Sequence, residues 1–207
     1  MSLVFSSIES KICNKGKFKG HLTTFVNLVG CNLNCKDCKK SYSIVKRLKK
    51  QADDIVPSIL RLGNDRIVIT GESLLQDDIY ILTYNLVSRG LKVVIETNGS
   101  IDIEETLYNR SYNFSINFRT PSSNSEKTNI LPLIDKLITG DEIRFKVNNY
   151  EDYKYASLVY KKYKGKAQYV LTTEDITLSS LIAEWLKEDK LNNFRLDLVI
   201  KGEDLNV

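Results

Sequence analysis

The sequence has few of the residues that mark flexible linkers and no long apolar run. Among 207 residues there are three prolines and ten glycines. There is also no low-complexity stretch or fixed-period repeat, so neither a linker nor a solenoid is indicated. Segment 1–20 lacks the apolar core of a signal peptide, and no later stretch approaches the roughly 20 apolar residues that cross a bilayer. We therefore expect one domain, residues 1–207, in a cytoplasmic protein that does not bind membranes.

A strong excess of one charge is also missing. Lys and Arg total 30 and Asp and Glu total 26, which gives a net charge of +4, and the two signs are mostly interspersed. One basic run, KKSYSIVKRLKK at 39–50, could attract an anionic ligand, but its pattern favours a solvated helix face. Because no basic strip is interleaved with stacking aromatic residues, direct nucleic-acid binding is not expected.

Apolar, β-branched runs alternate along the chain with segments of helical periodicity. The expected strands are 22–29, 65–70, 91–97, 112–118, 142–147, 167–171 and 194–200. The expected helices are 52–62, 77–90, 130–139, 150–163 and 178–188. This alternation predicts an α/β fold in which helical crossovers join parallel strands and functional residues lie at the strands' carboxyl ends.

Polar clusters follow the first four expected strands. They are a cysteine loop, TGES at 70–73, ETNG at 96–99 and NFRTPSS at 117–123. Because carboxyl ends of parallel strands meet at one edge of a sheet, these clusters could line a single pocket. Taken singly, two of them also have a purely structural explanation. Asn-Gly is a favoured turn dipeptide, and TPSS is typical of a helix start.

Three of the four cysteines lie close together in GCNLNCKDCKKS, residues 30–41, with the spacing C-x3-C-x2-C. In a reducing cytosol such crowded thiols bind metal or react more often than they form disulfides, and thiolates suit zinc or iron–sulfur centres. A closed zinc site needs a fourth ligand, for which Cys13 and His21 are the candidates. Three ligands on a four-iron cluster would instead leave one iron open to a small molecule.

GCNLNCKDC resembles the signature of radical S-adenosylmethionine (SAM) enzymes. The resemblance extends to IVITGESLLQ (67–76), which is similar to the family stretch T-G-G-E-P-L-L-Q. It also extends to VVIETNGS (93–100) and FSINFRTPSS (114–123), which are similar to segments of 7-carboxy-7-deazaguanine synthases. Ordered matches run from about Phe25 to Lys146. The resemblance implies the radical SAM core, a partial, open TIM-like β/α barrel with a mostly parallel sheet.

The resemblance also implies cofactors and a site. A [4Fe–4S] cluster would be held by Cys31, Cys35 and Cys38, and its reduced form would cleave SAM to a 5′-deoxyadenosyl radical. The residues implied for SAM binding are Asp37, Gly71, Glu72, Glu96, Asn98, Asn117 and Arg119, and those for substrate binding are Asn27, Thr70 and Lys40.

The implied reaction converts 6-carboxy-5,6,7,8-tetrahydropterin to 7-carboxy-7-deazaguanine, with SAM as a reusable cofactor. This step belongs to 7-deazaguanine biosynthesis, which leads to preQ0, queuosine and archaeosine. The resemblance further implies an external electron donor of the flavodoxin or ferredoxin type, and it allows a homodimer.

The chain departs from the family pattern around SAM. The double glycine of the SAM motif is shortened, so that Gly71 leads directly to Glu72, and Ser73 replaces the proline. Asp37 stands where the family commonly has an aromatic residue near adenine. The loop is therefore expected to hold SAM differently, with adenine packing supplied from elsewhere.

Further departures lie on the substrate side. Segment 13–15, Cys-Asn-Lys, replaces a Gln-Gly-Glu stretch that binds the pterin, and Asn27 replaces an arginine that binds its carboxylate. Asparagine cannot replace the charge of a guanidinium. Lys39 and Lys40 replace an Asp-Thr pair whose threonine helps to bind magnesium. Because ammonium groups do not ligate Mg²⁺, magnesium is not expected, and Lys40 is a candidate source of positive charge.

Several functions stay open at this point. The motifs favour a divergent synthase with a rearranged pterin pocket, and a radical SAM scaffold with altered substrate or lost catalysis is the nearest alternative. A second enzymatic alternative is an activase for an anaerobic ribonucleotide reductase or another glycyl-radical enzyme. The non-enzymatic alternative is a module that is stabilised by zinc or by a cluster and binds nucleic acid through residues 39–50.

Overall fold

A computed structural model describes residues 2–36, 38, 46–103 and 110–199. In this part of the chain nine strands form one sheet in the order β3-β1-β2-β4-β5-β6-β7-β8-β9. Their bounds are β1 Leu3–Ile12, β2 Leu22–Leu28, β3 Leu48–Lys50, β4 Arg66–Thr70, β5 Lys92–Thr97, β6 Asn113–Phe118, β7 Glu142–Lys146, β8 Gln168–Thr173 and β9 Phe194–Leu198. From β2 to β9 all neighbours are parallel, whereas β1 pairs antiparallel with β2 and β3.

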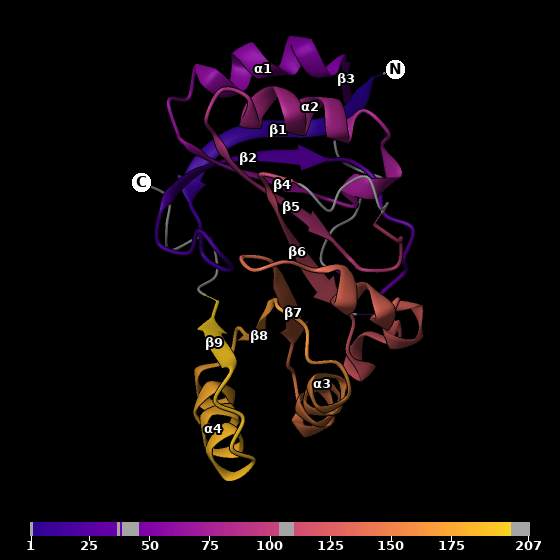
Figure 1. The fold of residues 1–207 in the computed structure, drawn as a ribbon, viewed down its shortest axis with the longest axis vertical. Coiled ribbons are helices and arrows are strands. Elements are labelled where there is room, and N and C mark those ends of the chain that lie inside the picture. The colour runs from indigo at the N-terminus through magenta and orange to yellow at the C-terminus, as the bar shows by residue number, and fades with distance from the viewer. Residues whose placement is uncertain (1, 37, 39–45, 104–109, 200–207) are drawn as a thin grey trace.

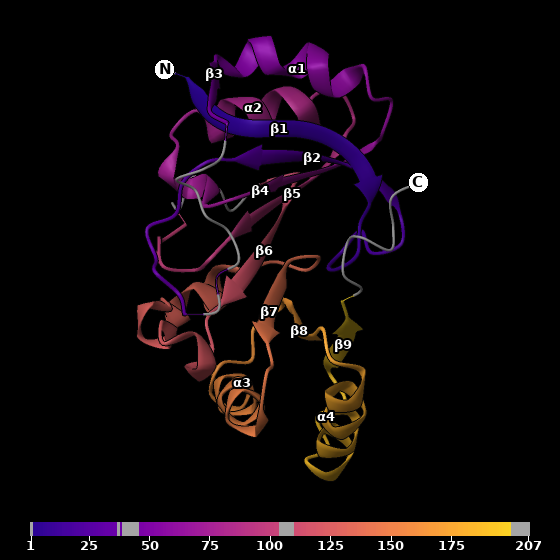
Figure 2. The same ribbon diagram turned by 180° about the vertical axis from the view of Figure 1, so that it is seen from behind.

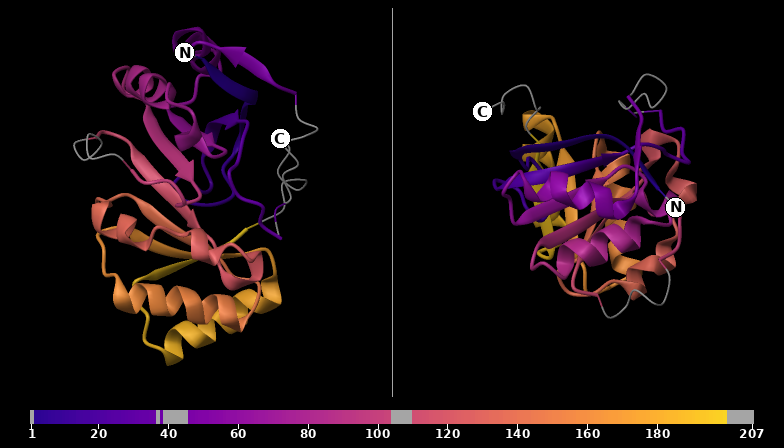
Figure 3. Two further views of the ribbon diagram at one scale, coloured as in Figure 1. Left: turned by 90° about the vertical axis from the view of Figure 1, so that its right-hand side faces the viewer. Right: turned by 90° about the horizontal axis from the view of Figure 1, so that it is seen from above.

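Helices cover the sheet in two groups (Figure 1). The first group, α1 (Ala52–Leu60) and α2 (Ile79–Val87), lies at the end of the sheet that contains β1. The second, α3 (Tyr150–Lys162) and α4 (Ile176–Glu188), lies at the opposite end, beside β7 to β9, as the side view of Figure 3 also shows. Short 3-10 helices complete the connections: η1 (Ser73–Leu75), η3 (Pro121–Ser123), η4 (Glu126–Thr128) and η5 (Leu131–Lys136). The architecture is therefore an open, mostly parallel β/α half-barrel, as the sequence predicted.

The two faces of the sheet have opposite chemistry because side chains alternate along each strand. On one face, apolar residues such as Ile69, Ile95 and Phe114 pack with the helices in a single core. On the other face, β5 and β7 place the buried polar residues Glu96 and Arg144. The apolar face stabilises the fold, and the polar face is left to form a site.

The hairpin loop between β1 and β2, residues 13–21, reaches across to the far edge of the sheet. Its Gly16 backbone N–H donates to Asp197 Oδ2 at 3.1 Å, and Lys19 Nζ donates to the Leu198 carbonyl at 3.1 Å. Figure 2 shows β1 arcing over β2, which brings this loop toward β9. The loop thus bridges the two ends of the open sheet and brings Lys15 to its polar face.

Most expected elements are confirmed, with some corrections. The seven predicted strands and four of the five predicted helices are present, and 130–139 forms the 3-10 helix η5, with Pro132 in its first turn. β1 was not predicted. The solvated helix face expected at 39–50 is wrong for Leu48–Lys50, which pair with β1 as β3, and 39–45 lie outside the described residues. Among described helices, none combines the length and apolarity required to cross a bilayer.

Candidate functional site

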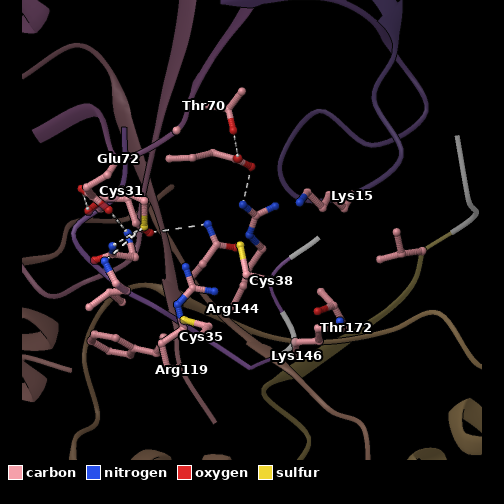
Figure 4. A pocket seen from close by; sticks show the side chains of 18 of the residues that line it. Lys15, Cys31, Cys35, Cys38, Thr70, Glu72, Arg119, Arg144, Lys146 and Thr172 are labelled. Atoms are coloured by element: carbon pink, nitrogen blue, oxygen red, sulfur yellow. Dashed lines mark hydrogen bonds and ion pairs between the residues drawn. The ribbon is translucent and has the colours of Figure 1, made fainter. Parts of the chain in front are cut away.

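A pocket of about 280 Å³ opens at the carboxyl ends of the parallel strands (Figure 4). It brings together residues from all four polar clusters that the sequence singled out. Those that line it are Cys31, Leu33, Cys35, Cys38, Thr70, Gly71, Glu72, Glu96, Thr97, Asn98, Asn117, Phe118 and Arg119. Strand topology accounts for this convergence, because each cluster directly follows a parallel strand of the same sheet.

The three loop cysteines face the pocket, and none of them forms a disulfide. Cys31 and Cys35 are half-buried and Cys38 is exposed. Two N–H groups approach the Cys31 sulfur, the Leu33 backbone at 3.4 Å and Asn98 Nδ2 at 3.8 Å. These contacts fix the position of the Cys31 sulfur at the edge of the pocket.

The residues present do not complete a closed zinc site. Cys13 is buried among Phe18, Phe25 and neighbouring valines, its S–H donates to the Lys15 carbonyl at 3.0 Å, and burial raises its pKa. His21, the other candidate ligand, is exposed on the hairpin loop. Within the described ranges no group of three or more His, Cys, Asp and Glu side chains is gathered to hold one metal ion. Three thiols around a wider cavity fit a multi-iron cluster better than a single ion.

Glu72 links the strand-end motifs to one another. Its carboxylate is 2% exposed and accepts from Thr97 Oγ1 and from the Asn98 backbone N–H, both at 2.7 Å. Its own backbone N–H donates to the Gly30 carbonyl at 3.2 Å, next to the cysteine loop. Burial raises the pKa of Glu72, and the hydrogen bonds and the charge of Arg119 oppose that shift only in part. The result is a buried carboxyl group held in a fixed position beside the cysteines.

Two glycines allow the strand ends to approach closely. Gly71 has a φ of +113°, and a Cβ there would lie 2.6 Å from the Leu28 carbonyl oxygen. Gly99 has a φ of +75°, and a Cβ there would lie 2.4 Å from Phe118 Cε1. The turn predicted for Asn98-Gly99 is therefore real, and it also carries the Asn98 side chain into the pocket.

Glu96 and Arg144 form a buried ion pair on the polar face of the sheet. The second carboxylate oxygen of Glu96 accepts from Thr70 Oγ1 at 2.8 Å. Burial acts to raise the pKa of Glu96, but the positive charges of Arg144 and then Lys15 outweigh it and hold that pKa well below its usual range. Glu96 is therefore ionised at every pH at which the protein is expected to work.

Asn117 and Arg119 close another side of the pocket. Asn117 Nδ2 lies 3.5 Å from the Thr97 carbonyl, and the Arg119 backbone is fixed by two bonds to the Asn129 side chain, at 2.9 and 2.8 Å. The following TPSS segment starts the 3-10 helix η3, with Pro121 at its first position. The TPSS motif therefore does start a helix, and the residues just before it, Asn117 and Arg119, also line the pocket.

Three site residues proposed from the sequence are not found among the described lining of this pocket. The Asn27 amide donates to Ser7 Oγ and Glu9 Oε1, both at 2.8 Å, and the residue does not line the pocket. Asp37 and Lys40 lie outside the described residues.

Sequence reasoning missed other lining residues, which are Arg144, Lys146, Thr172, Thr173, Glu174 and Val199. Lys15 was noted only as part of the segment that replaces a pterin-binding stretch, and it was not named as a site residue. A signal was present in EIRFK, residues 142–146. Its charged residues occupy alternate positions, so they must share one face of the strand.

The half-barrel and a pocket of three cysteines among polar strand ends are those of a radical SAM protein. No protein-family model matches the chain. A 7-carboxy-7-deazaguanine synthase from Clostridium acetobutylicum is 31% identical over 202 residues, which cover 91% of this chain and 90% of that protein. The synthase from Methanospirillum hungatei is 30% identical over 80% of this chain and 68% of its own length. This chain belongs to the 7-carboxy-7-deazaguanine synthase family.

A solved structure supports the same fold. The crystal structure of QueE from Escherichia coli matches 96% of this chain and 94% of its own, with a TM-score of 0.77 and 18% identity. The open β/α barrel that the sequence predicted is thus confirmed. Members of this family use a [4Fe–4S] cluster and SAM.

Proposed function

We propose that this chain is a 7-carboxy-7-deazaguanine synthase that acts on 6-carboxy-5,6,7,8-tetrahydropterin. The observation that carries the proposal is the convergence of three cysteines with the three other strand-end motifs in one pocket. The chain that builds this pocket is similar to a curated synthase over nine-tenths of both lengths.

In this proposal Cys31, Cys35 and Cys38 hold the cluster. When bound, the reduced cluster and SAM supply a 5′-deoxyadenosyl radical, the species that starts the reaction. The chain's own contribution is to bind and orient SAM and substrate and to keep water away from them. The N–H groups of Leu33 and Asn98 contact the Cys31 sulfur and fix its position at the pocket.

Gly71, Glu72, Asn98, Asn117 and Arg119 would bind SAM. Glu72 is held by hydrogen bonds from Thr97 and Asn98, so its position does not depend on the ligand. The glycine leaves the backbone at the end of β4 open to close approach. Such preorganised groups bind a ligand without the entropy cost of ordering them.

Glu96 would also bind SAM, and Thr70, which donates to Glu96 Oε2 at 2.8 Å, would meet the substrate edge. The roles proposed for Asp37 toward SAM and Lys40 toward substrate rest on the family resemblance alone. Asn27 is bonded to Ser7 and Glu9, which argues against a direct role in holding the substrate.

The remaining features of the proposal also rest on the resemblance. We propose a single-domain cytoplasmic enzyme with a small pterin substrate, which receives its electron from a flavodoxin- or ferredoxin-type donor. A homodimer is the proposed assembly, and neither nucleic acid nor a membrane is a proposed partner.

Anaerobic incubation tests the proposal. The reconstituted protein is mixed with a reductant, SAM and the carboxypterin, and both 5′-deoxyadenosine and 7-carboxy-7-deazaguanine are measured. A synthase forms the deazaguanine, and the Cys35→Ala variant does not. Cleavage of SAM without deazaguanine, in the same preparation, would exclude the synthase and leave an altered substrate or an activase.

A further inference from the structure

Two cationic side chains, Lys15 and Arg144, lie beside Glu96 in the pocket. Arg144, on β7, is 2% exposed and pairs with Glu96, while Lys15 reaches the same place from the hairpin loop and helps to keep Glu96 ionised. Figure 4 shows the Lys15 amine directed toward the Arg144 guanidinium. Glu142, two residues before Arg144, is itself paired with Arg195 at 2.7 Å. The charges of Arg144 and Lys15 therefore both act on the Glu96 carboxylate.

The Arg144 guanidinium also has unused hydrogen-bonding capacity. Within the described part of the chain its buried Nε has no hydrogen-bond partner, although another of its nitrogens is bonded to Glu96. A buried donor without an acceptor is destabilising, and a ligand that brings a negatively charged acceptor to this point reduces that cost.

We propose that Lys15 and Arg144 bind the carboxylate of the substrate and of the product. The inference rests on the proposed function, because 7-carboxy-7-deazaguanine carries a carboxyl group. Its planar carboxylate supplies both a negative charge and acceptor oxygens, which match a guanidinium and an ammonium group. Glu96 and Thr70 complete the subsite by fixing the orientation of Arg144. Lys15 therefore selects substrates by charge, from a loop that carries no other lining residue of this pocket.

Binding of two bases that differ only in the carboxyl group tests this subsite. The reconstituted enzyme, with SAM, is titrated with 7-carboxy-7-deazaguanine and with 7-deazaguanine by calorimetry. The natural chain should bind the carboxylated base at least about tenfold more tightly, in keeping with a charge-assisted contact. Lys15→Met should reduce that preference to about twofold or less while affinity for 7-deazaguanine is kept, and Lys15→Arg should retain the preference.

Lys17→Met is the matched control. Lys17 lies on the same loop but bonds Asn113 and the Gly140 carbonyl, away from this pocket, so the preference should not change. Equal binding of both bases by the natural chain, or an undiminished preference in Lys15→Met, would overturn the subsite. If the natural chain still forms deazaguanine in that case, the proposed function stands. If it forms none from the carboxypterin, the function and this inference fail together.

Discussion

Cys13 and Cys35 are the same residue in very different surroundings. Cys35 is half-buried at the pocket, whereas Cys13 is packed in a small apolar cluster with its thiol bonded to a carbonyl. After anaerobic reconstitution we expect about four irons and matching sulfide per chain, with visible absorption. Cys35→Ala should abolish the cluster, and Cys13→Ala should keep it. Stoichiometric zinc without sulfide, or loss of iron in Cys13→Ala, would contradict the assignment.

The Glu96–Arg144 pair predicts a pH-dependent stability. Replacing Glu96 by Gln leaves Arg144 buried without its counterion, which should cost about 3–5 kcal/mol at pH 7. The pKa of Glu96 is lower in the folded protein than its ordinary value of 4.5. The contribution of Glu96 to stability is therefore complete above pH 4.5, and it is lost only as the pH falls through the lower pKa of the folded state. Urea unfolding of the natural chain and of Glu96→Gln from pH 7 to pH 4 measures the gap between their free energies of unfolding.

The gap should be undiminished at pH 5, and its disappearance there would show that Arg144 does not lower the pKa of Glu96. A double variant, Glu96→Gln with Arg144→Met, supplies the control. It should lose less stability than the two single changes combined, because it leaves no unpaired buried charge.

A comparison of Gly71→Ala with Gly63→Ala distinguishes the cost of steric crowding from the cost of backbone strain. Both have positive φ, +113° and +73°, but a Cβ at 71 would meet the Leu28 carbonyl oxygen at 2.6 Å, and one at 63 would meet nothing within 4 Å. Gly71→Ala should therefore be less stable than Gly63→Ala by about 1–3 kcal/mol, the usual cost of overpacking. Equal urea midpoints would show that the ends of β2 and β4 are not so close.

Some residues of the site can be identified from the sequence, and others cannot. The three cysteines and each strand-end motif lie within short segments of the sequence, so their residue types and order point to the pocket. Arg144 and Lys15 become neighbours only because the hairpin loop crosses to the far edge of the sheet, where long-range hydrogen bonds to β9 hold it. Spacing along the chain carries no trace of such a contact, although the alternating charges of EIRFK do signal one polar face.

Among the elements, the hairpin loop is held to the far edge of the sheet by Asp197. This carboxylate is 3% exposed and accepts from the Gly16 backbone N–H and from Arg195, all at 3.1 Å. Asp197→Ala leaves those donors without that acceptor and should lower stability by about 2 kcal/mol. Asp65→Ala is the control, because Asp65 is exposed and its ion pairs are screened by water.

Urea midpoints of the two variants measure the difference. If Asp197→Ala is as stable as Asp65→Ala, the loop is not anchored through this carboxylate, and Lys15 must be positioned by other contacts.

The predicted strands are determined by local sequence pattern, whereas those that were not predicted are determined by tertiary pairing. β2 and the strands from β4 to β9 are apolar, β-branched runs between helical segments, so local pattern identifies them. β1 contains Ser6, Ser7, Glu9 and Ser10, and β3 is a basic tripeptide, and both are fixed by pairing at the sheet edge. Tertiary pairing overrides local preference there, as is common for strands. In 130–139 the proline and the loop packing favour a 3-10 helix over an α-helix.

For the molecule as a whole, the sequence predicts the fold class well because each parallel strand requires a crossover and each crossover covers the same face. The openness of the barrel and the long reach of β1 are set by sheet curvature and are visible only in three dimensions. The open side gives the polar face access to ligands, and the hairpin loop narrows that opening at β9.

The number of 7-carboxy-7-deazaguanine molecules formed per SAM tests the whole account most directly. The reconstituted chain is given limiting SAM, a reductant and excess carboxypterin under anaerobic conditions, and the products are identified by mass. Because SAM is proposed to be regenerated after each cycle, the deazaguanine formed should exceed the SAM supplied. Accumulation of 5′-deoxyadenosine with no deazaguanine would contradict the account.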